Sequence, residues 1–145
     1  MIEESKISLA KITKLDFTKG RPVLIVEYPG FKKSFTLNKE VFSIGRHPNN
    51  SLVLEDKQVS RCHATIVWLE HQDDHGNLYR GYWILDGRGK KQRSSNGIVI
   101  NGKRKFSHRL RNGDIIMIAN NITITYEFIT YNTQNNNKLK TVYYL

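Results

Sequence analysis

Short apolar or alternating runs recur along the chain from Pro22 onward, and none is long enough to predict a helix. Val, Ile, Thr, Tyr, Phe and Trp fill these runs, and such residues suit a pleated, half-buried surface. Turn sequences such as Tyr28-Pro29-Gly30 and Asn112-Gly113-Asp114 separate them. The pattern predicts strands at 22–28, 33–37, 41–45, 51–54, 62–69, 80–86, 98–100, 104–106, 115–118 and 122–129.

Many short strands at this spacing, with no helical runs between them, favour an all-β fold. We expect two antiparallel sheets packed face to face as a β-sandwich. A chain of 145 residues with 39% hydrophobic residues suits one domain with a sizeable core. We place this domain at 21–130, after an N-terminal extension at 1–20 and before a polar C-terminal tail at 131–145.

The chain is strongly basic, with a formal net charge of +10. Most of the excess lies in residues 81–145, where eleven Lys and Arg stand against three Asp and Glu. It concentrates in two turn-rich stretches, at 88–93 and 103–111. An anionic partner is therefore expected.

Several classes of protein are disfavoured by what the sequence lacks. No apolar run approaches the roughly 20 residues that span a bilayer, and the acidic N-terminus lacks the order of a secretory signal, so a cytoplasmic protein is expected. The single cysteine, Cys62, excludes an internal disulfide. Alternation places it on one face with Ala64, Ile66 and Trp68, which predicts a buried structural residue in a core stripe.

Enzyme signatures are also absent. No nucleophile elbow, phosphate-binding P-loop or zinc-protease motif occurs, and Gly87-Arg88-Gly89 lacks the third glycine and the helix of a dinucleotide fingerprint. His71 and His75 flank two aspartates, but this polar stretch is more typical of a solvated hairpin loop than of a metal site. We therefore expect no catalysis, no metal and no cofactor.

Three separate stretches carry the most informative pattern. Ile44-Gly45-Arg46 ends one predicted strand, Ser60-Arg61-Cys62-His63 begins another, and Ser95-Asn96-Gly97 precedes Asn101-Gly102. Each is weak alone, since Asn-Gly, for example, is a common hairpin turn. Their order and spacing resemble the forkhead-associated (FHA) domain over residues 22–129. The resemblance implies an eleven-stranded β-sandwich whose loops at one end bind phosphothreonine peptides.

The resemblance also implies residues that bind the ligand. Arg46 corresponds to the arginine that pairs with the phosphate, and Ser60 to the serine whose hydroxyl donates to it. Arg61 is similar to the residue that adds a second phosphate contact, and Ser95 occupies the position beside the phosphate. Asn96 corresponds to the asparagine that hydrogen-bonds the peptide backbone.

The remaining matched residues are implied to be structural. Gly45 and Gly97 shape two loops, and His63 braces the loop that carries Ser60. Asn101 and Gly102 form the second turn, with no ligand role assumed.

This donor set suits a phosphothreonine, which carries a charge of about −1.5 to −2 and three acceptor oxygens. We therefore expect a module that binds a phosphothreonine-containing protein or peptide in Ser/Thr kinase signalling, without contact to membranes. One alternative is a basic β-module that binds nucleic acid. It would need aromatic residues beside the basic ones, and Tyr79, Tyr82, Trp83 and Phe106 are candidates, although Trp83 is expected in the core. Another is a structural scaffold that uses only its C-terminal Tyr-Tyr-Leu end.

Overall fold

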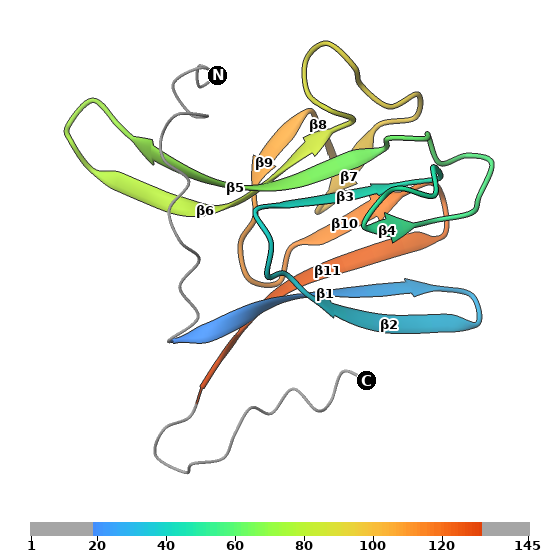
Figure 1. Cartoon of the computed structure of the whole chain (residues 1–145), viewed down its shortest axis with the longest axis horizontal. Coiled ribbons are helices and arrows are strands. Elements are labelled where there is room, and N and C mark those ends of the chain that lie inside the picture. Colours follow the sequence, from blue (N-terminus) through green and yellow to red (C-terminus); the bar gives the residue numbers. More distant parts are fainter. Residues whose placement is uncertain (1–18, 132–145) are drawn as a thin grey trace.

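The computed structural model describes residues 19–131, which form eleven strands in two sheets packed face to face (Figure 1). The first sheet has six strands, in the order β2 (Phe31–Thr36), β1 (Gly20–Tyr28), β11 (Ile122–Thr130), β10 (Ile115–Ile118), β7 (Ile98–Ile100) and β8 (Lys103–Lys105). The second has five, in the order β4 (Leu52–Val53), β3 (Val41–Gly45), β5 (Ala64–Gln72), β6 (Leu78–Asp86) and β9 (Ser107–Arg109).

The all-β sandwich predicted from the sequence is confirmed, and each predicted strand has a counterpart within a few residues. Two details differ. Strand β9 was not predicted, because Ser107-His108-Arg109 has no apolar alternation and becomes a strand by pairing with β6. Strands β3 and β4 pair in parallel, whereas the other paired strands of residues 19–131 are antiparallel. Apart from their innermost residues, the predicted extension and tail lie outside the described residues.

The core lies between the two sheets, where the alternating side chains of each strand point inward. Isoleucines dominate it, and burying each one contributes about 1.5–3 kcal/mol. Its largest side chain that is almost fully buried is Tyr82, whose hydroxyl donates a hydrogen bond of 2.8 Å to the Lys39 carbonyl. The described residues include no helix long and apolar enough to cross a membrane.

Two predictions about the core were wrong. Trp83 is only half-buried, because its neighbours Tyr82 and Ile84 take the inward positions of β6. Cys62 is also only partly buried, because β5 begins at Ala64 and the predicted alternation does not extend back to the cysteine. The rest of the predicted stripe is confirmed, since Ala64 and Ile66 are buried and Trp68 packs against the core.

Three connections meet at the end of the sandwich opposite the β5–β6 hairpin (Figure 1). They join β3 to β4, β4 to β5, and β6 to β7. Backbone hydrogen bonds hold them together: the Arg46 amide donates to the Ser60 carbonyl over 3.0 Å, and the Gly87 amide donates to the His63 carbonyl over 2.7 Å. Residues far apart in the sequence are thereby held at one rim.

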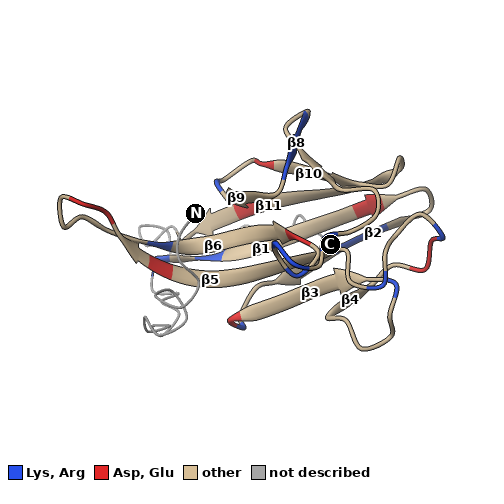
Figure 2. Ribbon diagram, turned by 90° about the horizontal axis from the view of Figure 1, so that it is seen from above, with Lys and Arg blue, Asp and Glu red and all other residues tan. Residues whose placement is uncertain are grey.

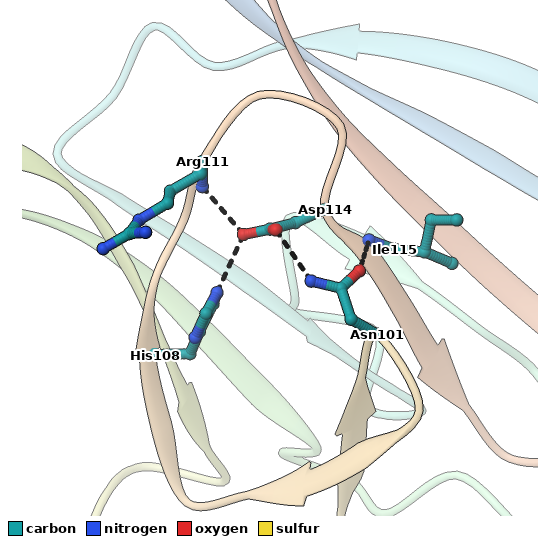
Figure 3. A network of polar contacts seen from close by, with 5 residues as sticks. All are labelled: Asn101, His108, Arg111, Asp114 and Ile115. Carbon is teal, nitrogen blue, oxygen red and sulfur yellow. Dashed lines mark hydrogen bonds and ion pairs between the residues drawn. The ribbon is translucent and has the colours of Figure 1, made fainter.

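A second polar network fixes the turn between β7 and β8 (Figure 3). Asn101 and Gly102 both have positive φ, 52° and 85°, as an Asn-Gly hairpin turn requires. The side-chain amide nitrogen of Asn101, Nδ2, donates a hydrogen bond of 2.9 Å to one carboxylate oxygen of Asp114. The other oxygen accepts from the Arg111 amide and from Nε2 of His108, each over 2.8 Å. The buried Asp114 carboxylate therefore joins three segments.

This carboxylate should make stability depend on pH. Burial alone would raise the pKa of Asp114, but the donated hydrogen bonds and the nearby imidazole outweigh burial and hold the pKa below its ordinary value of 3.8. The contribution is therefore fully present above pH 3.8 and is lost as pH falls through the lower folded-state pKa.

We expect Asp114→Asn to lower the free energy of unfolding by about 1–3 kcal/mol at pH 7, because the charged acceptor is lost. The difference between wild type and variant, measured by urea denaturation, should shrink below pH 3.8. A difference that stays constant down to pH 2.5 would contradict this role.

Candidate functional site

His63 connects two of the three loops from the interior of the protein. Its side chain is fully buried. Nδ1 accepts a hydrogen bond of 2.9 Å from the Ser60 amide, so Nε2 carries the ring proton and donates to the Gly97 carbonyl over 2.9 Å. A neutral imidazole thus satisfies one donor and one acceptor on separate loops. The His63 side chain thus joins the β4–β5 loop to the β6–β7 loop.

The Ser60 hydroxyl lies where the β4–β5 and β6–β7 loops meet. Its oxygen accepts a hydrogen bond of 2.9 Å from the Ser95 amide. A hydroxyl that accepts from the backbone keeps its own hydrogen for another partner. Ser60 can therefore donate to a ligand while its oxygen is held in place.

Arg46 follows β3 directly and is oriented before any ligand arrives. Its Nε donates a hydrogen bond of 2.9 Å to the carbonyl of Val59, a fully buried residue. This contact leaves both Nη groups for a ligand. The preceding residue, Gly45, allows the end of β3 to pack closely against the backbone of Arg61, because a Cβ at position 45 would collide with the Arg61 carbonyl.

Asn50 holds the backbone of Arg61 and was not predicted as a site residue. Its Nδ2 donates to the carbonyls of His47 and Arg61, over 3.0 and 2.7 Å. The Arg61 side chain itself is exposed. Only the polar turn at Pro48-Asn49-Asn50 was visible in the sequence, and it does not reveal the contact across eleven positions.

Asn96 and Gly97 form the far side of the same rim. The Asn96 side chain is exposed, and its Nδ2 donates to the Gln58 carbonyl over 2.9 Å. Gly97 has a φ of 79°, and a Cβ there would lie 2.6 Å from Nε of Arg104. The positive φ therefore favours glycine at this position, and a larger residue would also displace the Arg104 side chain.

Asp86 and Ser94 support the β6–β7 loop from the interior of the protein, and neither was predicted as a site residue. Both are buried, and one Asp86 oxygen accepts from the amide and the hydroxyl of Ser94. The Ser94 hydroxyl oxygen in turn accepts from the Gly97 amide over 2.8 Å. An aspartate at the end of a strand is common in sequences, so no local signal distinguishes this one.

A cavity of about 730 Å³ opens between the loops. Its lining includes four of the predicted ligand residues, Arg46, Ser60, Arg61 and Ser95, while Asn96 adjoins Ser95 outside the lining. Asn101 and Gly102 belong instead to the Asp114 network and do not line the cavity. Four of the predicted ligand residues therefore lie together at the cavity, whereas the predicted Asn101-Gly102 turn lies apart from them.

The lining is basic. It contains the guanidinium groups of Arg46, Arg61, Arg88 and Arg93, and none of the described residues that line it is acidic. Figure 2 shows basic segments in the loops beside β4 and on β8, and acidic residues at the tip of the β5–β6 hairpin. The charge distribution therefore directs an anion to the cavity.

The features expected of the alternative functions are not assembled at this cavity. Tyr82 is in the core, Phe106 stacks with Arg93 and is half exposed, and Tyr79 donates a hydrogen bond to Asp73 in the β5–β6 hairpin. None of the aromatic candidates, Trp83 included, lines the cavity, where they could stack with bases beside the arginines. Within residues 19–131 no three His, Cys, Asp or Glu residues are placed to hold a metal ion, and Asp73 instead accepts hydrogen bonds that close its hairpin.

The β-sandwich thus carries, at one end, a basic cavity formed by loops from three separate parts of the chain. A family model described as FHA domain matches residues 42–119, more than half of the chain. The chain therefore belongs to the FHA domain family, as the resemblance predicted.

Relatives agree with this assignment. The uncharacterized protein sll1895 of Synechocystis sp. is 38% identical over 106 residues, which cover 73% of this chain and 15% of that protein. The crystal structure of Slr1951 from Synechocystis sp. aligns with a TM-score of 0.61 at 28% identity, over 75% of this chain and 96% of that one.

A third similar protein is Mycobacterium tuberculosis EmbR, whose structure was determined in complex with a low-affinity phosphopeptide. It aligns with a TM-score of 0.53 at 30% identity, over 72% of this chain and 24% of EmbR. This chain thus spans only a small part of the length of sll1895 and of EmbR.

We expect His63→Ala to lower the free energy of unfolding by about 2–5 kcal/mol, because it leaves the Ser60 amide and the Gly97 carbonyl without partners and opens a cavity. Denaturant unfolding measures this loss. His71→Ala, in the β5–β6 hairpin, is the matched control and should change stability by about 0.5 kcal/mol or less. An unchanged melting temperature for His63→Ala would contradict its bracing role.

Proposed function

We propose that the protein is a non-catalytic module that binds phosphothreonine peptides. The observation that carries this proposal is the meeting of Arg46, Ser60, Arg61 and Ser95, from three separate loops, at one basic cavity. Membership of the FHA family and the likeness to EmbR, which was solved with a phosphopeptide, support it.

The phosphate would be held by side chains whose positions are already set. Arg46 offers its two Nη groups and Ser60 its hydroxyl hydrogen, because Nε and the hydroxyl oxygen are engaged within the protein. Arg61 adds a second guanidinium. Hydrogen bonds to charged groups contribute about 1.5–3 kcal/mol each. A few of them offset the cost of ordering and reach the −8 kcal/mol of micromolar binding.

Asn96 would hold the peptide backbone beside the phosphothreonine. Because one Nδ2 hydrogen is donated to the Gln58 carbonyl, the amide plane is fixed. Its Oδ1 can then accept from a peptide N–H, and the second Nδ2 hydrogen can donate to a peptide carbonyl. Preference for threonine over serine follows from the FHA family, whose members seat the γ-methyl group in a small pocket.

We expect Arg46→Ala to weaken binding of a phosphothreonine peptide by about 2–5 kcal/mol, the cost of breaking an enclosed charge pair. Isothermal titration calorimetry measures the change. Arg111→Ala removes an exposed arginine away from the cavity and should bind like wild type. Equal affinity of the wild type for phosphorylated and unphosphorylated peptides would refute the proposed function.

Binding should weaken in acid. The second pKa of a phosphate ester is near 6, so below about pH 6 the ligand loses one of its two negative charges and the attraction to Arg46 and Arg61 falls. Titrations from pH 7.5 to 5 should show this decline in wild type and in His47→Gln, which removes the imidazole that also lines the cavity. A flat profile over this range would contradict binding of the dianion.

A further inference from the structure

Resting on the proposed function, we propose that the preferred ligand carries further negative charge close to the phosphothreonine, and that Arg88 and Arg93 bind it. Side-chain carboxylates and a second phosphate share the required chemistry. The cavity is thus a site for a doubly anionic segment of a partner protein.

The number of arginines at the cavity exceeds what one phosphate uses. Arg46 and Arg61 suffice to pair with a charge of about −2. Arg88 and Arg93 line the same cavity, and neither forms an ion pair with any residue from 19 to 131. A ligand with neutral flanks would leave two guanidinium groups beside the bound phosphate without an anion of their own.

The β6–β7 loop is folded so that only some of its cations face the cavity. The Arg88 amide donates to the Gln92 carbonyl over 2.8 Å, and the Gln92 amide donates to the Gly89 carbonyl over 3.1 Å. The loop is anchored by the Thr65 hydroxyl, which donates to the Gly87 carbonyl over 2.7 Å. Arg88 and Arg93 consequently line the cavity, whereas Lys90 and Lys91, at the tip, do not.

Arg93 is held in place by an aromatic ring. Its guanidinium carbon lies 3.7 Å from the centroid of Phe106, whose side chain is 50% exposed. Stacking of this kind engages the flat face of the guanidinium and leaves its N–H groups, which lie in the plane, for an acceptor. The stack therefore orients a second anion-binding fork next to the phosphate site, and it accounts for an exposed aromatic residue among basic ones.

The test compares, by fluorescence anisotropy, the binding of five peptides that are variants of one parent sequence. Four contain phosphothreonine: one with neutral flanks, one with two glutamates before it, one with two glutamates after it, and one with a second phosphothreonine nearby. The fifth has the glutamates on both sides but unphosphorylated threonine. The proteins are wild type, Arg88→Gln/Arg93→Gln, and the matched control Lys90→Gln/Lys91→Gln, which removes the same charge from the same loop.

We expect wild type to bind one of the two glutamate peptides about fivefold more tightly than the neutral phosphopeptide, as paired exposed charges allow. The doubly phosphorylated peptide should gain about tenfold, because phosphate is a stronger bidentate partner. Both gains should fall below about twofold in Arg88→Gln/Arg93→Gln and persist in Lys90→Gln/Lys91→Gln. Phe106→Ala, which changes no charge, should lose part of the gain.

Equal gains in wild type and Arg88→Gln/Arg93→Gln would overturn this inference and leave the proposed function intact, since phosphate dependence would remain. Loss of the gain in the lysine variant as well would also overturn it, because general attraction by the loop would then explain the preference. Failure of the proposed function looks different: none of the phosphopeptides would bind more tightly than the unphosphorylated one. Competition by single-stranded RNA at equal charge would overturn the inference in favour of nucleic acid.

Discussion

The loop arrangement around the cavity depends on one buried imidazole. His63 accepts from the Ser60 amide and donates to the Gly97 carbonyl, so one side chain sets the distance between two loops that are 37 residues apart in the sequence. A neutral histidine suits this position because one ring nitrogen accepts and the other donates. An unpartnered polar group in the interior is costly, so the two loops are held in a single arrangement.

Around this brace, contacts within the protein orient the groups that we propose to bind the ligand, and each contact engages only part of the group. The Arg46 guanidinium is attached through Nε alone, the Ser60 hydroxyl through its oxygen, and the Asn96 amide through Nδ2. Each keeps donors or acceptors for a ligand. Because these side chains are ordered beforehand, the proposed binding of a peptide would cost less entropy, which is the physical basis of preorganisation.

The lining of the cavity is basic, although Glu55 and Asp56 lie in the β4–β5 loop at the same end of the molecule. The cavity lining contains four arginines and no acid among its described residues, whereas Asp73 and Asp74 lie on the β5–β6 hairpin at the other end (Figure 2). Where a carboxylate does lie deep in the protein, as at Asp86 and Asp114, it accepts hydrogen bonds that build the loops, although Oδ2 of Asp86 has no hydrogen-bond partner among the described residues. These two buried acidic groups thus support the fold.

Alternation of apolar residues by itself determined the β-sandwich, because a period of two leaves one face of each strand to be buried. The order of Gly45-Arg46, Ser60 and Asn96-Gly97 likewise indicated the rim. Only the tertiary structure decided features that depend on distant partners. Ser107–Arg109 became a strand by pairing with β6, Cys62 faced the cavity because β5 begins after it, and Arg93 was placed by stacking on Phe106. Such contacts cannot be predicted from local sequence, because they form only when the folded chain brings the two partners together.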